Sequence, residues 1–284
     1  MKHYFLNDQL IEAAEARIHA SDLGLLRGYA LFDFFRVTSG IPVFLADYLD
    51  RFRRSAGRLN IDLAVTDDTL TERIDTLLEA NDAPESAVRL VLTGGYSADG
   101  FTPAASNLLI LQHEAPSYSE SLFQQGAHLM THRYVRDIPD VKSTNYAMVL
   151  ALLPQLEQLG AQDVLWHDGA RIAESSRSNF FVVDRDRNLR TASNQVLYGI
   201  TRKHVIDLAK EVMTVEEGEV PLDLLKGAQE AFVTSTTKGV MPVTRIDGKP
   251  IGAGAPGPIT QQLARRFAAH VDAYVAARLD QAPA

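Results

Sequence analysis

The sequence predicts a mixed α/β (α+β) protein of two domains. Its 284 residues are too many for one simple core. Short strand patterns alternate along the chain with segments that repeat apolar residues at helical spacing. A polar, proline-containing stretch around Pro116 separates two such mixed halves. We therefore expect an N-terminal domain over residues 1–115, a linker over 116–121 and a C-terminal domain over 122–284.

The N-terminal half contains both strand and helix signals. Ser39-Gly40 marks a hairpin turn after an apolar strand. Apolar residues recur at helical spacing from Leu45 to Leu59, and Thr66 can cap the next helix. The expected elements are strands at Tyr4–Leu6, Arg17–His19, Leu31–Thr38, Ile41–Leu45, Val88–Thr93 and Leu108–Gln112, and helices at 45–59 and Asp68–Asn81.

The C-terminal half alternates strands and helices. Asp168-Gly169 is its strongest hairpin signal, because Asp-Gly favours the two-residue turns that join antiparallel strands. The expected elements are strands at 164–167, 171–173, 179–183, 189–192 and 229–234, and helices at 147–153, 201–212 and 258–279.

Composition and charge exclude several classes of protein. The net charge of −8 argues against a nucleic-acid-binding face, which needs clustered basic residues. The first residues lack the apolar run of a signal peptide, and no apolar segment is long enough to span a bilayer. The chain has no cysteine, and its eight histidines have no metal-ligand spacing, so we expect no metal. These features fit a cytoplasmic protein without a membrane or nucleic-acid partner.

Four segments together contain the kinds of group needed to hold pyridoxal 5′-phosphate (PLP). Lys142 lies in a polar turn before an apolar run and supplies an amine for a Schiff base. Glu174 follows about thirty residues later and can pair with a protonated pyridine nitrogen. The turns in 197–202 and 232–237 are rich in Gly, Thr and Ser, whose N–H and O–H groups can bind a phosphate.

The motifs as a set resemble the class IV (fold type IV) PLP-dependent aminotransferases. This family includes D-amino-acid aminotransferases, branched-chain aminotransferases and aminodeoxychorismate lyase. The resemblance covers essentially the whole chain and implies a small N-terminal α/β domain, a larger C-terminal domain with a β-barrel-like sheet and helices, and a homodimer. The motifs that carry it, in family order, are Arg27-Gly28-Tyr29, Tyr48-Leu49-Asp50-Arg51-Phe52, Val141-Lys142-Ser143-Thr144-Asn145-Tyr146, Glu174-Ser175-Ser176-Arg177-Ser178-Asn179-Phe180, Gly199-Ile200-Thr201-Arg202 and Ser235-Thr236-Thr237.

The resemblance also implies residue roles. Lys142 would form the Schiff base and then move a proton between Cα of the amino acid and C4′ of the cofactor. Glu174 would keep the pyridine nitrogen protonated, and Tyr146 would contact the phenolic oxygen. The phosphate would be bound by Arg51, by Ile200 and Thr201 at a helix N-terminus, and by Thr236 and Thr237.

The residues available to bind the substrate carboxylate differ from those of the familiar members of the family. The stretch Leu92–Gly100 lacks the arginine and histidine that familiar D-amino-acid aminotransferases have there, and Arg36 replaces an expected tyrosine. An arginine side chain matches a carboxylate with two hydrogen bonds. Arg177, Arg27 and Arg36 are therefore the candidates, and Arg177 is favoured because it lies close to Glu174 in the sequence.

We expect transamination, by a ping-pong mechanism, of D-amino acids with 2-oxoglutarate or pyruvate. A less common group of D-amino-acid aminotransferases is similar in having arginines at positions 27 and 177. The alternatives are a branched-chain L-amino-acid aminotransferase, a lyase of the aminodeoxychorismate type, and a catalytically silent relative that binds a ligand.

Overall fold

The computed structural model describes residues 1–281, and residues 282–284 of the predicted C-terminal domain lie outside the described residues. The chain divides into two compact units. Unit 1 contains Met1–Pro116, Val141–Asn145 and the residues from Ala273, and unit 2 contains Ser117–Asp140 and Tyr146–Asp272. The predicted boundaries and the linker 116–121 stay a prediction.

Unit 1 is built on a six-stranded antiparallel sheet with strand order β2-β1-β6-β5-β3-β4. Successive side chains of a strand face opposite sides of the sheet. Asp33 and Phe35 of β3 face helix α2, where Phe35 contacts Tyr48 and Asp33 binds Arg51. The elements are β1 (His3–Leu6), β2 (Gln9–Glu12), α1 (Leu23–Arg27), β3 (Ala30–Thr38), β4 (Ile41–Pro42), α2 (Leu45–Leu59), α3 (Asp67–Asn81), β5 (Ser86–Thr93) and β6 (Asn107–Glu114).

Helix α2 confirms the helix expected from apolar spacing over residues 45–59. Its apolar side chains Leu49, Phe52 and Ala56 are buried, while Arg54 on the other face is exposed. The helix ends at Leu59, and its C-cap Asn60 takes a left-handed conformation with φ 52° that asparagine tolerates well. Helix α3 begins as expected after Thr66, whose side-chain oxygen accepts from the N–H of Thr69.

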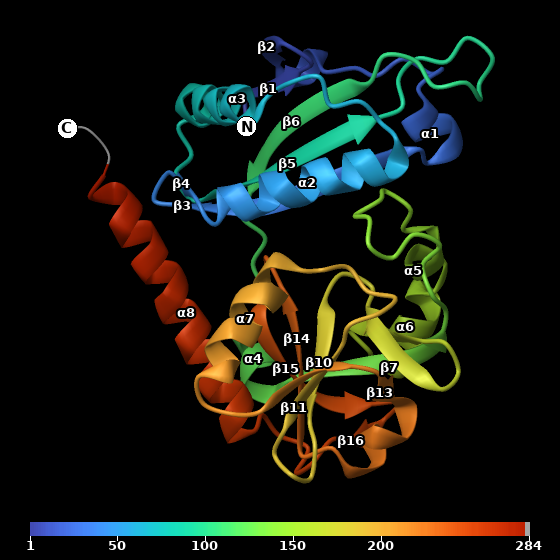
Figure 1. The fold of residues 1–284 in the computed structure, drawn as a ribbon, viewed down its shortest axis with the longest axis vertical. Coiled ribbons are helices and arrows are strands. Elements are labelled where there is room, and N and C mark those ends of the chain that lie inside the picture. Colours follow the sequence, from blue (N-terminus) through green and yellow to red (C-terminus); the bar gives the residue numbers. More distant parts are fainter. Residues whose placement is uncertain (282–284) are drawn as a thin grey trace. The chain divides into compact units, whose positions relative to one another are not determined.

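Unit 2 is built on a ten-stranded mixed sheet (Figure 1). The strand order is β12-β11-β10-β14-β15-β7-β8-β9-β13, and β16 pairs with β15. Strand β11 lies near one end of this order, and β9 and β13 lie at the other end. Because β11 also contacts β9 and β13, the sheet curls toward the barrel-like form expected from the resemblance. The strands are β7 (Ala127–Arg133), β8 (Asp163–His167), β9 (Arg171–Ser175), β10 (Asn179–Val183), β11 (Leu189–Ala192), β12 (Val215–Gly218), β13 (Val220–Pro221), β14 (Glu230–Ser235), β15 (Gly239–Ile246) and β16 (Lys249–Pro250).

The helices of unit 2 cover its sheet, and α7 is held by a buried apolar cluster (Figure 1). Val205 and Ile206 of α7 belong to the same cluster as Phe181 of β10, Phe232 of β14 and Leu263 of α8. This packing fixes the direction of α7 and therefore the place where it begins. The helices are α4 (Glu120–Gln125), α5 (Ala147–Ala151), α6 (Leu153–Leu159), α7 (Ile200–Lys210) and α8 (Pro258–Leu279), whose last residues from Ala273 belong to unit 1.

Two strand predictions in unit 1 are wrong. Arg17–His19 is irregular. β1 pairs with β2 and β6 instead, and Asn7 at φ 57° allows the chain to turn back directly from β1 into β2. The strand expected at Ile41–Leu45 ends at Pro42, which has no N–H to donate, and α2 begins at Leu45. Within residues 1–281, no helix combines the length and apolar character needed to cross a membrane.

The buried Arg51–Asp33 ion pair generates a stability prediction. Arg51 and Asp33 are 5% and 0% exposed, so Asp33→Asn replaces a buried carboxylate that pairs with a buried cation by a neutral amide. We expect a loss of about 3 kcal/mol or more in the free energy of unfolding, measured by urea denaturation. The control is Asp50→Asn, because Asp50 pairs with Arg54 at 65% and 62% exposure and its loss should cost under about 1 kcal/mol. Equal losses in the two variants would contradict the prediction.

Candidate active site

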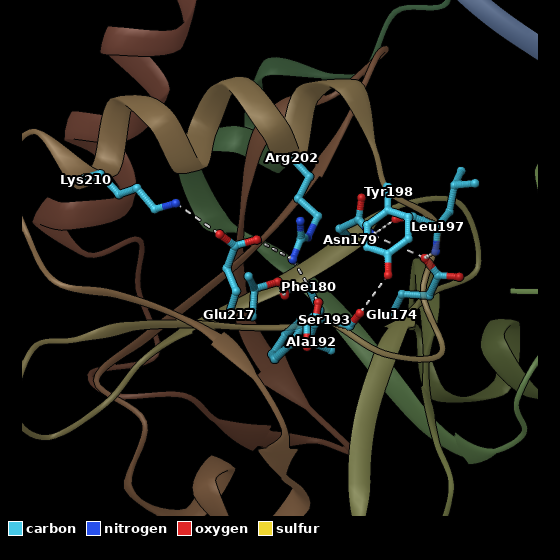
Figure 2. A network of polar contacts seen from close by, with 11 residues as sticks. Glu174, Asn179, Phe180, Ala192, Ser193, Leu197, Tyr198, Arg202, Lys210 and Glu217 are labelled. Atoms are coloured by element: carbon cyan, nitrogen blue, oxygen red, sulfur yellow. Dashed lines mark hydrogen bonds and ion pairs between the residues drawn. The ribbon is translucent and has the colours of Figure 1, made fainter. Parts of the chain in front are cut away.

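The carboxylate of Glu174 in unit 2 accepts hydrogen bonds on both of its oxygens. Glu174 lies on β9 and is 5% exposed. Its Oε1 accepts from Nε and Nη2 of Arg136 at 3.0 and 2.7 Å. Its Oε2 accepts from Nδ2 of Asn179 at 3.2 Å and from the N–H of Leu197 at 3.0 Å (Figure 2). Donors on both oxygens compensate for the water lost on burial, so the carboxylate has a defined position and orientation.

The loop from Ser193 to Gly199 leads from β11 into α7. Gly199 is the N-cap of α7, and no side chain among residues 1–281 caps this end. Ile200 and Thr201, the first two helical residues, are buried. A helix N-terminus presents backbone N–H groups and the positive end of the helix dipole, so this end suits an anion.

Arg202 fixes the first turn of α7 to two strands. Its Nη2 donates to the carbonyl of Ala192 at 3.0 Å and pairs with Glu217 at 3.2 Å (Figure 2). Glu217 also binds Lys210 at the other end of α7, at 3.1 Å. Burial lowers the pKa of the Arg202 guanidinium, and the charge of Glu217 acts in the opposite direction. One carboxylate on β12 thus holds both ends of the helix.

Thr236 and Thr237 lie in the turn between β14 and β15 and are half-buried. The Oγ1 of Thr237 is 3.4 Å from the hydroxyl of Tyr118. Lys238, the last residue of this turn, is 8% exposed. Its Nζ pairs with Asp163 at 3.4 Å and donates to the hydroxyl of Ser178 at 3.1 Å.

Arg177 lies in the turn between β9 and β10 and is exposed. The serines on either side of it are fixed, because Ser176 donates to Asp163 and Ser178 accepts from Lys238. Within residues 1–281, the guanidinium of Arg177 has no ion-pair partner. The turn is therefore anchored at its base and presents a cation at its tip.

Lys142 belongs to unit 1, in the segment Val141–Asn145. Its carbonyl accepts from the N–H of Phe32 at 2.8 Å, and the N–H of Thr144 donates to Ala30 at 3.1 Å. This backbone pairing to β3 holds the lysine against the sheet, and its Nζ lies 4.6 Å from the centre of the Phe32 ring. Phe32 and Asp33 are successive residues, so Lys142 lies on the face of β3 opposite to α2.

The other predicted residues of unit 1 have different surroundings. Arg51 donates from Nε and Nη2 to Asp33 at 2.9 and 2.6 Å. Arg36 is half-buried on β3, and its Nε is buried without a hydrogen-bond partner among residues 1–281. Arg27 is exposed at the end of α1.

Unit 2 thus brings together Glu174 and the start of α7, and it also contains Arg177, Thr236, Thr237 and Tyr146, the N-cap of α5. Unit 1 contains Lys142, Arg27, Arg36 and Arg51.

Several contacts around these residues have no signal in the sequence. Arg136 lies 38 positions from Glu174 and belongs to no motif. Asn179 ends the motif that begins with Glu174, but nothing in its spacing indicates that it contacts Leu197. Arg89 of β5 was also missed, and its guanidinium lies over Phe32 and Phe34 at 4.9 and 5.2 Å from the ring centres.

Comparison with known proteins defines the class. A sequence model described as Amino-transferase class IV matches residues 30–246. The D-alanine aminotransferase of Listeria innocua is 31% identical over 92% of this chain and 93% of its own. That of Staphylococcus aureus is 27% identical over 96% of this chain and 99% of its own.

Solved structures give the same class. The Escherichia coli branched-chain amino acid aminotransferase superposes with a TM-score of 0.86 at 25% identity, covering 94% of this chain and 93% of its own. The T.th. branched-chain amino acid aminotransferase, solved with pyridoxamine 5′-phosphate, has a TM-score of 0.87 at 26% identity and covers 95% and 93%.

The fold is that of the fold type IV aminotransferases, as the sequence predicted. The chain belongs to the class IV aminotransferase family and is an aminotransferase. Members of this family depend on PLP and act on an amino acid and a 2-oxo acid.

Proposed function

We propose that this aminotransferase binds PLP and moves the amino group of a D-amino acid to a 2-oxo acid, 2-oxoglutarate or pyruvate, by a ping-pong mechanism. The observation that carries the proposal is the position of Arg177, an exposed cation on an anchored turn three residues after Glu174. A guanidinium held in this way suits a substrate carboxylate. Similarity to D-alanine aminotransferases over more than nine-tenths of the chain supports the D-amino-acid preference.

The residues of unit 2 fit the two ends of the cofactor. The fixed carboxylate of Glu174 is an acceptor for a pyridine N–H. The start of α7 lacks a side-chain cap from the described residues, so the N–H groups around Ile200 and Thr201 can take a phosphate. Thr236 and Thr237 would add donors to the same phosphate from the β14–β15 turn, and Tyr146 would contact the phenolic oxygen. The resemblance makes Arg51, in unit 1, a further anchor for the phosphate, and the structure binds its guanidinium to Asp33 on the α2 side of β3.

Proton movement is assigned to Lys142. When bound, PLP accepts the electron pair that remains after the Cα–H bond of the amino acid breaks. Nζ of Lys142 would take the proton from Cα of the amino acid and deliver it to C4′ of the cofactor. The backbone pairing of Lys142 with β3 fixes the position of its Cα, while the length of the lysine side chain allows Nζ to move. Arg27 and Arg36 remain further candidates for binding a carboxylate.

A branched-chain L-amino-acid aminotransferase is the second candidate. Two solved structures of that class have TM-scores of 0.86 and 0.87. Phe32 and Phe34 lie on the same face of β3 as Lys142 and could line an apolar pocket for the substrate side chain. The homodimer expected from the resemblance and the cytoplasmic location stay predictions.

The covalent attachment site tests the cofactor proposal. After incubation with PLP and reduction with borohydride, digestion and mass mapping should find the pyridoxyl adduct on the peptide containing Lys142. The reason is that reduction converts the C=N bond to Lys142 into a stable amine. Lys142→Ala should give no adduct. An adduct on any other lysine of the wild-type protein would overturn the assignment.

A panel of amino donors tests the stereochemical proposal. The PLP-loaded enzyme is mixed separately with D-alanine, D-glutamate, L-leucine and L-valine, and the visible absorbance of the cofactor is followed. We expect rapid loss of the visible band with D-alanine or D-glutamate and little change with the L-amino acids. Rapid loss with L-leucine but with neither D-amino acid would support the branched-chain enzyme instead.

Arg177→Ala tests the carboxylate contact. Loss of a hydrogen bond to a charged group costs about 1.5–3 kcal/mol, so KM for the amino acid should rise roughly tenfold to a hundredfold. The visible band should be unchanged, because the arginine is not assigned to the cofactor. The control is Arg265→Ala on the exposed face of α8, which should leave KM unchanged. An unaltered KM in Arg177→Ala would show that its guanidinium does not bind the substrate.

A further inference from the structure

We propose that Asn179 is a positioning residue that sets the separation between Glu174 and the start of helix α7. The inference rests on the proposed function, in which Glu174 receives the ring N–H of the cofactor and the helix start receives its phosphate. These two protein groups must stand at a fixed separation, because the cofactor that joins them is a rigid ring with a short phosphate arm. Asn179 contacts both groups through one side-chain amide.

The nitrogen end of this amide joins Glu174 to the loop before α7. Nδ2 of Asn179 donates to Oε2 of Glu174 at 3.2 Å and to the carbonyl of Leu197 at 2.7 Å (Figure 2). Both partners are acceptors only, so the amide nitrogen must face them, and the orientation of the side chain is determined. The N–H of Leu197 closes the triangle by donating to the same Oε2 at 3.0 Å.

The oxygen end of the amide lies against the N-cap of α7. A Cβ added to Gly199 would lie 2.2 Å from Oδ1 of Asn179. Gly199 has φ −66° and ψ 140°, a conformation open to any residue. Glycine is therefore needed here for space and not for an unusual backbone angle, and the space is occupied by Asn179.

The backbone of Asn179 is itself fixed. It is the first residue of β10, is 5% exposed and pairs with Thr234 of β14. Strand β14 runs on into the turn with Thr236 and Thr237, the other proposed phosphate contacts. The amide therefore projects from a backbone that the sheet holds in place. Its hydrogen bond to Glu174 and its steric contact with Gly199 can fix the positions of both residues.

Binding of pyridoxamine 5′-phosphate and of inorganic phosphate to the cofactor-free protein tests the inference. Pyridoxamine 5′-phosphate engages both ends of the site but forms no bond to Lys142, whereas inorganic phosphate engages only the helix end. Asn179→Ala and Gly199→Ala should each raise Kd for pyridoxamine 5′-phosphate about tenfold or more. Kd for phosphate should change less than about twofold, because the N–H groups of the helix start remain.

The double variant Asn179→Ala with Gly199→Ala tests whether the two effects on Kd are additive. The added methyl group of Gly199→Ala collides with the Asn179 amide, so in the Asn179→Ala background it should weaken binding little further. Asn194→Ala, an exposed asparagine of the same loop, is the matched control and should bind both ligands like the wild type. If Asn179→Ala does not fold, Gly199→Ala alone still provides the comparison of the two ligands.

Three outcomes would overturn the inference. They are wild-type affinity for pyridoxamine 5′-phosphate in the single variants, strictly additive effects in the double variant, and an equal loss of affinity for inorganic phosphate. The last outcome would mean that Asn179 only supports the helix start. Failure of the wild-type protein to bind pyridoxamine 5′-phosphate would instead refute the proposed function, so the two failures are distinguishable.

Discussion

A carboxylate inside a protein is stable only if donors replace the water that it loses, and the surroundings of Glu174 follow from this requirement. Arg136, Asn179 and the N–H of Leu197 converge on it from three separate segments. Each donor is in turn fixed elsewhere, as Asn179 is by β10 and the loop of Leu197 is by α7. The loop before α7 must therefore lie where the N–H of Leu197 can donate to the buried carboxylate of Glu174.

Other buried charges connect segments in the same way. Arg51 and Asp33 join α2 to strand β3. Arg202 and Glu217 join the first turn of α7 to β12, and Asp163 joins the turn of Arg177 to the turn of Thr237. Buried ion pairs contribute little net stability because desolvation offsets their attraction, but a wrong arrangement leaves a charge unpaired. Their main effect here is to select one arrangement of the loops.

The sequence predicted the fold well where the pattern is local and poorly where partners are distant. The helix at 45–59 and the strands Asn179–Val183 and Leu189–Ala192 were predicted with their observed ends, because spacing and turn residues mark them. Family motifs indicated the fold type and the aminotransferase class correctly. The contacts between Arg136 and Glu174 and between Lys238 and Asp163 span 38 and 75 positions, and no local pattern indicates such pairs.

Gly199 shows a second limit of prediction from sequence. Its place before Ile200 and Thr201 marks a helix start, which the structure confirms. The steric reason for a glycine is visible only in three dimensions, since it depends on the approach of Asn179 from strand β10. A sequence motif can therefore identify a position correctly without disclosing which neighbour restricts it.

The pair between Lys238 and Asp163 has a chemical consequence. A carbonyl compound can condense with an amine only if it reaches the nitrogen. Nζ of Lys238 is bound to Asp163 and to the hydroxyl of Ser178, and burial at 8% exposure limits access of reagents to it. The amine in the turn of Thr236 and Thr237 is thereby shielded, so a reactive carbonyl compound would have to displace both contacts before it could react there.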